Sequence, residues 1–182
     1  MAVPAVPQSC APPDAQGDDA VPAHSFTACM RQIPGAVAIV AAGSVGDRRG
    51  LVATSWCSVS VEPASVLVCV NRDASAHDVI RRCGLFSLNP LTTDHGEIMS
   101  VFAGQRGLAG EARFHHGHWR TGRSGAPVLM DAVASLECRL AEHYVHHSHS
   151  IFIGRVIHLR TTPEAEALIY TRHAGARAVA LA

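Results

Sequence analysis

Short apolar runs separated by turn residues dominate the hydrophobic pattern of this chain. Runs of this length, bounded by Gly, Pro and Asn, are typical of β-strands. The continuous run at 65–70 indicates a strand covered on both faces. We expect strands at residues 36–42, 51–61, 65–70, 85–91, 134–144, 150–159 and 168–171. The strand at 134–144 alternates, with Leu136, Cys138 and Leu140 on one face and Glu137, Arg139 and Ala141 on the other.

Few segments show the spacing of a helix. Phe26, Met30 and Ile33 share one face of a helix predicted over residues 25–33, with Ser25 as its N-cap. The dipeptide Pro34-Gly35 ends that helix.

Two further helices are indicated by their end signals. Ser75, three residues before Asp78, resembles a capping box, and Gly84 suits the C-terminal stop of a helix of about two turns. Asp94 is expected to cap another helix that runs through Phe102. Residues 103–126, rich in Gly, Arg and His, are interpreted as a long excursion. Six or seven strands with few, short helices predict a mostly β barrel with helical decoration.

Length and composition place these elements in one domain. The chain has 182 residues, of which 48% are hydrophobic and 16% charged, which suits a single globular core. The proline-rich segment 1–24 is expected to be a disordered or loosely attached tail, with an arm around a partner subunit as the alternative, and residues 25–182 to form the domain. Since no apolar run reaches 18 residues, we expect no membrane span. The 15 basic and 15 acidic residues cancel, so the field of a nucleic-acid binder is absent.

The basic residues and the cysteines narrow the chemistry further. All 15 basic residues are arginines, which excludes Schiff-base chemistry, covalently held pyridoxal phosphate and a P-loop lysine. The 6 cysteines form no C-x-x-C pair, and several lie inside apolar runs. Reduced thiols acting as small hydrophobic residues, in a cytoplasmic protein without a secretion signal, are therefore expected.

The segment 52–60 shows the strongest chemical signal. Small and hydroxyl residues crowd a strand that otherwise ought to be apolar, which would let a flat ligand approach the backbone. Thr54, Ser55 and Ser58 offer hydroxyls to ribityl or phosphate oxygens, although a strand with one solvated face would show the same pattern. The first turn of the helix at residues 75–77 offers free N–H groups to a phosphate, although it is also compatible with an ordinary helix start.

Two histidine clusters, at 115–118 and 143–149, contain 7 of the 12 histidines. Imidazoles at this spacing could hold zinc or nickel. No Asp or Glu lies inside either cluster, and we interpret them as exposed loop histidines, with a metal site as the alternative.

The order and spacing of landmarks across residues 26–172 resemble the flavin reductase-like family, the FMN-binding split barrel. The landmarks are residues 34–37, 50–60, 63–70, 77–84, 85–91, 102–103, 125–129, 136–138, 149–156 and 170–172.

The resemblance implies a homodimer that transfers a hydride from NADH or NADPH to FMN or FAD and supplies reduced flavin to a separate monooxygenase. It implies no catalytic side chain, because the flavin supplies the chemistry. The cofactor-binding residues that it implies are Val52, Ala53, Thr54, Ser55, Cys57 and Ser58 along the ribityl chain and ring edge; Ser75, Ala76 and His77 at the phosphate; Asn89 near the isoalloxazine; and His149, Tyr170 and Arg172 beside the nicotinamide.

The chain also departs from the family pattern. Val52 replaces a usual Thr, Ser75 and Ala76 replace a cation and a Thr, His147 and Ser148 replace Gly-Asp, and His173 replaces a Gly. Each lost hydrogen bond to a charged group is worth about 1.5–3 kcal/mol, so weaker flavin binding is expected. Arg72 and Arg81 are candidates to compensate. Two alternatives therefore stay open: a flavin-binding module with little or no reductase turnover, and a metal-binding protein that uses the histidine clusters.

Overall fold

The computed structural model describes residues 20–172 and 174–177. The helices are α1 (Ala23–Met30), α2 (Ser75–Cys83) and α3 (Gly96–Phe102), with single 3-10 segments η2 (Thr93–His95) and η3 (Gly110–His115). The strands are β1 (Gly35–Ala36), β2 (Ala38–Ala42), β3 (Arg49–Ala53), β4 (Trp56–Val61), β5 (Ala64–Asn71), β6 (Leu85–Pro90), β7 (Trp119–Thr121), β8 (Pro127–Leu129), β9 (Ala134–His146), β10 (His149–Thr161), β11 (Leu168–Thr171) and β12 (Ala174–Arg177).

The chain divides into two units at Ile33–Pro34. The first contains α1, which begins at Ala23 after Pro22 and not at the predicted N-cap Ser25. The Thr27 hydroxyl donates to the Ala23 carbonyl, 2.7 Å away, so the first turn forms earlier than the sequence predicts. A domain boundary at residue 24 stays a prediction, and most of the predicted tail lies outside the described residues.

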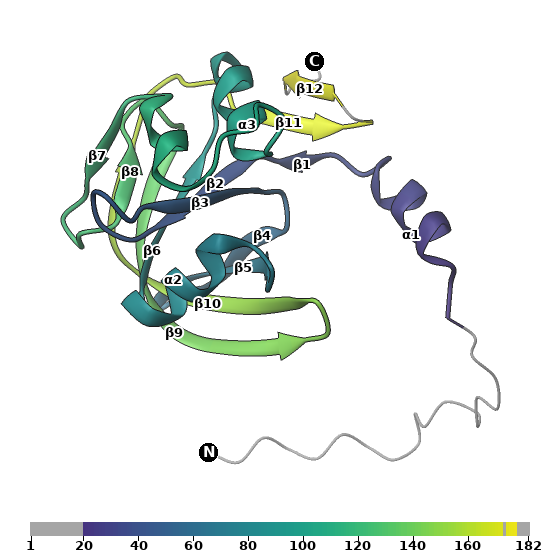
Figure 1. The fold of residues 1–182 in the computed structure, drawn as a ribbon, viewed down its shortest axis with the longest axis horizontal. Coiled ribbons are helices and arrows are strands. Elements are labelled where there is room, and N and C mark those ends of the chain that lie inside the picture. Colours follow the sequence, from purple (N-terminus) through teal and green to yellow (C-terminus); the bar gives the residue numbers. More distant parts are fainter. Residues whose placement is uncertain (1–19, 173, 178–182) are drawn as a thin grey trace, which may run out of the picture. The chain divides into compact units, whose positions relative to one another are not determined.

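A seven-stranded antiparallel sheet forms the second unit, in the order β3-β2-β6-β9-β10-β5-β4 (Figure 1). The predicted mostly β barrel is confirmed. The single strand predicted at 51–61 is wrong, because Thr54 and Ser55 separate β3 from β4. These two strands follow each other along the chain but occupy opposite ends of the strand order, so the short turn spans the opening of the curled sheet.

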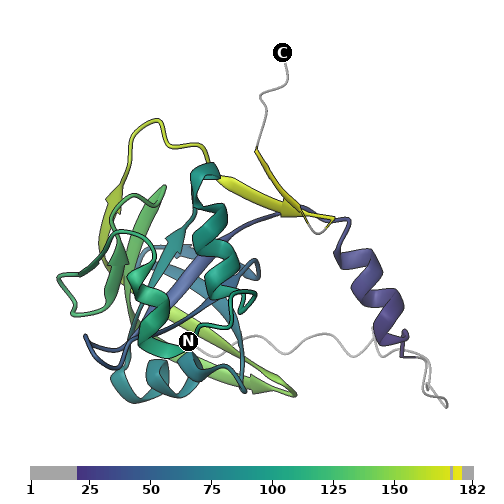
Figure 2. The ribbon, with the colours of Figure 1, turned by 45° about the horizontal axis from the view of Figure 1, so that its top comes forward.

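Two smaller sheets, β1-β11-β12 and β7-β8, complete the architecture (Figure 2). Val37 connects β1 to β2 and joins the two sheets, since its N–H donates to Leu168 and its carbonyl accepts from Leu91. The sequence analysis did not predict strands β7, β8 and β12, because they are short and have no apolar alternation long enough to detect.

Apolar side chains pack on both sides of β2. Ala38, Val40 and Ala42 belong to one core cluster, and Ile39 and Ala41 to another. The apolar run at 38–42 is therefore explained by coverage of both faces. Strand β5 differs from the expectation, because Val66, Val68 and Val70 are buried while the residues between them are only half-buried.

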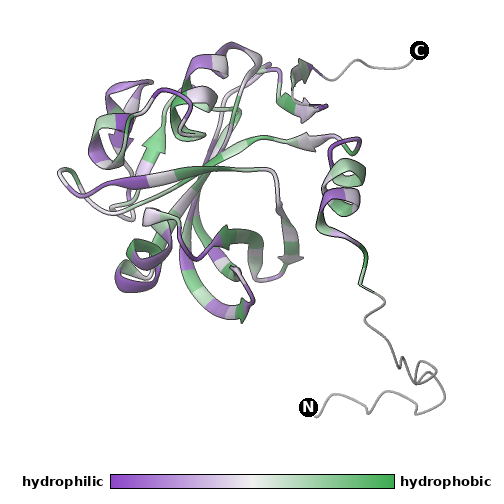
Figure 3. Cartoon of the chain, turned by 45° about the vertical axis from the view of Figure 1, so that its right-hand side comes forward, coloured by the Kyte–Doolittle hydropathy of each residue, from purple (hydrophilic) through white to green (hydrophobic). Residues whose placement is uncertain are grey.

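Helix α2 ends as predicted but begins differently. Gly84 adopts the left-handed conformation, with φ of 64°, that closes the helix. The predicted capping box is wrong: Ala74 is the N-cap, and no side chain caps the first turn. Asn71 forms the preceding turn instead, because its side-chain oxygen accepts from the Asp73 N–H at 2.9 Å. Figure 3 shows polar and apolar residues alternating around this helix.

The helical segment near residue 94 and the following excursion also differ from expectation. Thr92, and not Asp94, precedes the helical segment, and its N–H donates to His95 Nδ1 at 3.2 Å. The excursion at 103–126 is partly ordered by side-chain packing. Phe114 contacts Phe102 at 5.2 Å and Trp119 at 4.9 Å between ring centroids, which anchors η3 and β7 to the core.

Candidate functional site

The turn between β3 and β4 exposes hydroxyl groups beside a buried strand end. Thr54 and Ser55 are exposed, whereas Ala53 is buried at 6% exposure. Cys57 and Ser58, on β4, are also exposed. Trp56 packs against the core and donates its indole N–H to the Ala36 carbonyl at 2.9 Å, so its ring is held inward. The small and hydroxyl-bearing surface expected from the sequence is therefore accessible.

A cavity of about 210 Å³ lies next to this turn and is lined by Val52, Thr54 and Tyr170. Tyr170 reaches it because β11 pairs with β1, which places Tyr170 opposite Gly35. A Cβ atom on Gly35 would lie 3.4 Å from the Thr54 Cβ, so the two segments are in close contact. The sequence analysis missed Val37, Met99 and Gln105, which line the same cavity without any motif to signal it.

A second cavity, of about 500 Å³, lies where α2 begins. His77, Arg72 and Arg81 line it together with His143 and Ser148 of the β9–β10 hairpin. The two arginines proposed as compensating cations therefore do flank His77. Asp73 and Asp78 line the cavity too and offset their charge. A phosphate here would depend on the uncapped amides of α2 as well as on the guanidinium groups.

His77 is itself buried, at 4% exposure, and joins α2 to β10. Its Nε2 atom lies 2.9 Å from the Ser150 hydroxyl, and its Nδ1 atom lies 3.1 Å from Asp78 Oδ1. These distances resemble those of a Ser-His-Asp triad. Ser150 is fully buried, so no substrate carbonyl can reach its hydroxyl, and the arrangement is structural.

Other predicted site residues lie away from any accessible surface. Ala76 and Asn89 have 0% exposure. The Asn89 amide donates to Ile39 O at 3.2 Å and Ser87 Oγ at 2.8 Å, and its oxygen accepts from the Leu129 N–H at 3.0 Å. Asn89 therefore fastens β8 to the sheet, and its polar atoms are occupied by the protein.

The remaining predicted residues are exposed or half-buried. Ser75 is exposed in the first turn of α2. His149 lies on β10 opposite Asn71 of β5, and the next strand along is β4. Arg172 follows β11 with φ of 48° and is exposed. The departure at His173 lies outside the described residues.

The burial of thiols around β4 and β5 is uneven. Cys57 is exposed and Cys69 is half-buried on the neighbouring strand. Burial is the larger cause, and the nearby Cys57 the smaller cause, of a raised pKa of the Cys69 thiol.

Across residues 20–172 and 174–177, no group of three or more His, Cys, Asp or Glu side chains is placed to hold a metal ion. No helix in the same part of the chain is long and apolar enough to cross a membrane.

The curled seven-stranded sheet, with β3 and β4 at its two ends, defines a split-barrel protein. A family model described as "Flavin reductase like domain" matches residues 30–177. The chain belongs to this family.

Curated relatives with a stated activity support the same assignment. The chain is 38% identical over 141 residues to the FMN reductase (NADH) RutF of Agrobacterium fabrum, covering 78% of this chain and 80% of that protein. It is 32% identical over 165 residues to the protein of the same name in Pseudomonas syringae pv. syringae, and the match covers 91% of this chain and 92% of that protein.

Solved structures show the same fold. BorF, the flavin reductase component of a bacterial two-component tryptophan halogenase, superposes with a TM-score of 0.78 at 28% identity, over 85% of this chain and 96% of BorF. The NADH:FAD oxidoreductase SgcE6 of Streptomyces globisporus, in complex with NAD and FAD fragments, superposes with a TM-score of 0.78 at 29% identity. The match covers 86% of this chain and 92% of SgcE6.

Proposed function

We propose that this protein is an NADH-dependent flavin reductase that uses FMN or FAD as its flavin. Membership of the family and the activity named for its relatives support this activity. The structural observation that carries it is the pairing of two features beside β5. The backbone carbonyl of Ser55, in the exposed hydroxyl turn, accepts from the backbone N–H of Cys69 on β5, and the uncapped helix α2 begins four residues after β5 ends.

The residues of this chain bind and orient, and the bound flavin supplies the hydride-accepting chemistry. Thr54 and Ser55 are available to hydrogen-bond a polar flavin chain, and the first turn of α2, with Arg72 and Arg81, is available to its phosphate. Because Asp73 and Asp78 offset both arginines, we expect the flavin to be held as an exchangeable substrate. His149, Tyr170 and Arg172 are proposed to border the nicotinamide.

Steady-state kinetics test this proposal. Purified protein mixed with FMN and NADH should oxidise NADH only when flavin is present, as followed by the NADH absorbance band. A tight flavin complex that does not oxidise NADH would instead support the flavin-binding module, and no effect of flavin with either nicotinamide would overturn the reductase assignment.

A variant locates the flavin on the hydroxyl turn. Thr54→Val removes one neutral hydrogen bond, worth about 0.5–1.5 kcal/mol, and should raise the KM for FMN by about 2- to 10-fold. Thr161→Val, at the exposed end of β10, is the matched control and should leave KM unchanged. Equal KM values in all three proteins would remove Thr54 from the site.

We propose further that the protein acts as a homodimer. Strand β4 is at one end of the sheet, and Val59 and Val61 on it are 50% and 94% exposed. Tyr144 and Val145, near the end of β9, are also exposed apolar residues. Apolar side chains on an exposed edge strand favour pairing with another chain. Light scattering should give a dimer that Val61→Glu weakens, and a fully active monomer would contradict the proposal.

A separate monooxygenase is the proposed consumer of the reduced flavin. The similarity to BorF, which is named as the flavin reductase component of a two-component halogenase, supports a two-component system. We also propose the cytoplasm as the location, because NADH and free flavin are supplied there. Stimulation of a reconstituted flavin-dependent oxygenase by this protein, FMN and NADH would test the first of these two proposals.

A further inference from the structure

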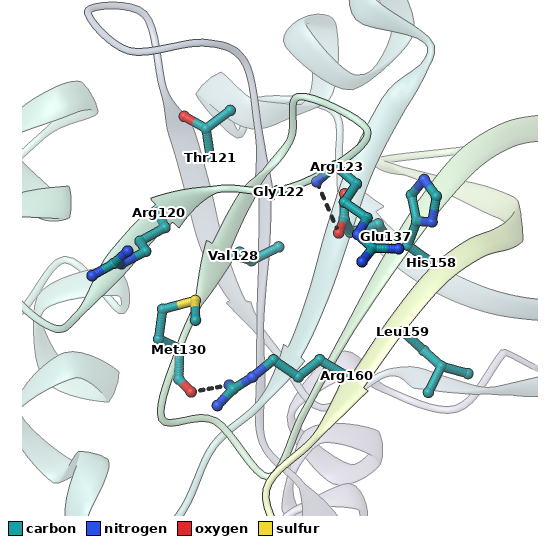
Figure 4. Close-up of a pocket in the computed structure, with 10 residues that line it drawn as sticks. All are labelled: Arg120, Thr121, Gly122, Arg123, Val128, Met130, Glu137, His158, Leu159 and Arg160. Atoms are coloured by element: carbon teal, nitrogen blue, oxygen red, sulfur yellow. Dashed lines mark hydrogen bonds between the residues drawn. The ribbon is translucent and has the colours of Figure 1, made fainter.

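A third cavity, of about 450 Å³, shares no lining residue with the two cavities of the proposed flavin site. It is formed by the β7–β8 hairpin and by the parts of β9 and β10 remote from their connecting turn (Figure 4). Glu137, at this cavity, is nine residues along β9 from His146 at the hairpin tip, which corresponds to roughly 30 Å of strand. The cavity therefore belongs to a different part of the barrel surface from the residues around α2.

The charged groups of this cavity are mostly cationic. Arg120, Arg123 and Arg160 line it, with His158 beside them. Glu137 is the single acidic lining residue. Among residues 20–172 and 174–177, no ion pair involves any of these three arginines, whereas Arg48, Arg49, Arg81 and Arg82 all have carboxylate partners.

The Glu137 carboxylate is committed to the protein backbone. It accepts from both the N–H and the hydroxyl of Ser124 at 2.6 Å, and from the Arg123 N–H at 3.2 Å. Burial acts to raise its pKa, but the hydrogen bonds from Ser124 and Arg123 and the nearby His158 outweigh burial and lower the pKa. Glu137 thus stays ionised while its oxygens are directed at the loop.

The same carboxylate fixes where the Arg123 side chain emerges. A Cβ atom on Gly122 would lie 2.5 Å from Glu137 Oε2, so only glycine fits at this point of the loop. Arg160 is held from the other side, because its Nη1 donates to the Met130 carbonyl. Figure 4 shows Arg160 reaching the Met130 carbonyl, whereas Arg123 lies beside Glu137 and His158.

A neighbouring pair of arginines adds to the positive potential. Arg139 and Arg155 are directly opposite each other on β9 and β10, and both are exposed. Arg139 is two residues from Glu137 and so shares its face of the strand. Like charges in direct cross-strand pairs are destabilising, and a bound anion would relieve part of that repulsion.

We propose that this cavity is a second ligand site, specific for a small phosphate ester. Guanidinium groups match phosphate oxygens in a planar, bidentate geometry, and the volume is that of a small-molecule site. Val128, Met130 and Leu159 provide an apolar wall for the organic part of the ester. A concave site of this size favours a small molecule over an acidic protein surface.

Isothermal titration calorimetry tests the site, with inorganic phosphate and phenyl phosphate as probes and with the protein saturated with FMN, so that the phosphate position proposed at α2 is already filled. We expect saturable binding of both, with phenyl phosphate bound more tightly because its ring covers the apolar wall. Arg123→Gln and Arg120→Gln should each weaken binding by about tenfold or more, since each removes a charge-assisted contact. Arg106→Gln, which changes an exposed arginine outside the cavity, should bind like the wild type.

Several outcomes would overturn the proposal. These are no saturable binding of either probe, equal affinity for the two probes, equal affinity in the Arg123 and Arg106 variants, or binding of a poly-glutamate peptide in place of phenyl phosphate. Thermal melting of each variant checks that the barrel is intact. Arg123→Gln should retain flavin-dependent NADH oxidation, so the result is independent of the proposed reductase activity.

Discussion

His77 Nε2 lies 2.9 Å from the hydroxyl oxygen of Ser150, and this contact joins the first turn of α2 to strand β10. Both side chains are buried, and the His77 ring also packs on Phe152 at 5.3 Å between centroids. The contact therefore sets the position of the helix end relative to β10, and with it the position of the proposed phosphate site.

Removing this contact should destabilise the barrel. His77→Ala leaves the buried Ser150 hydroxyl without this partner and opens a cavity beside Phe152, so we expect a loss of about 2–4 kcal/mol in the free energy of unfolding. Asp78→Asn changes a side chain that is 79% exposed, and it should change the free energy of unfolding by less than about 0.5 kcal/mol. Urea unfolding of both variants measures the difference, and equal stabilities would show that the contact is unimportant.

Gly154 is expected to tolerate no side chain. A Cβ atom there would lie 2.5 Å from Phe86 Cζ and 2.8 Å from Cys138 Cβ, in the middle of the core. Gly154→Ala should therefore cost about 1–3 kcal/mol by overpacking. Gly96→Ala, where no atom lies within 4 Å and the backbone is helical, should be neutral or stabilising. Thermal melts that rank the two variants in the opposite order would refute this packing argument.

The thiols should differ sharply in reactivity. Burial, as the larger cause, and the adjacent Glu137, as the smaller one, raise the pKa of Cys138 to about 12. Its reactive thiolate is therefore scarce at neutral pH. Cys57 is exposed. With iodoacetamide at about pH 8, near the ordinary thiol pKa, mass spectrometry should find Cys57 alkylated in the native protein and Cys138 only after denaturation. Modification of Cys138 under native conditions would contradict its burial.

The ion pair between Arg48 and Glu111 should make stability depend on pH. Arg48 donates from its backbone N–H at 2.9 Å and from Nε at 2.7 Å, and the Arg48 side-chain hydrogen bond lowers the pKa of Glu111. A lowered folded-state pKa contributes stability above the unfolded value, about 4.3, and loses it as pH falls through the folded value.

Glu111→Gln should accordingly lower the free energy of unfolding by about 1.5–3 kcal/mol near neutral pH. The deficit should shrink below about pH 4, because wild-type Glu111 is then progressively protonated. Glu166→Gln, at an exposed carboxylate, serves as the control. Chemical denaturation at both pH values measures the effect, and a deficit independent of pH would rule out the ionic contribution.

The local pattern predicted much of the fold because strand length and helix ends are local properties. The run at 65–70 and the Gly84 stop both appear where expected, within one or two residues. The break at Thr54–Ser55 was not predictable from the pattern, since small residues suit both a strand and a turn. Only closure of the sheet between β3 and β4 requires the break.

The sequence predicted only those features of the candidate site that depend on local residue type, and it missed those that depend on long-range packing. The exposed hydroxyls of Thr54 and Ser55 follow from residue type, and their exposure agrees with the sequence analysis. Asn89 looks equally polar in the sequence, yet it is buried and hydrogen-bonded to three protein groups, on β2, β6 and β8. Two of these partners, Ile39 and Leu129, are 50 and 40 residues away along the chain and leave no local signal.

The sequence by itself determined the class of fold, the hydroxyl-bearing segment and the helix that begins near Ser75, because these depend on neighbouring residues and on the order of family landmarks. The tertiary structure alone decided which side chains meet: Tyr170 beside Thr54, Arg72 and Arg81 beside His77, and Arg120, Arg123 and Arg160 around one cavity. The physical reason is that strand pairing joins segments as far apart along the chain as Gly35 and Tyr170, and side-chain chemistry depends on those long-range neighbours.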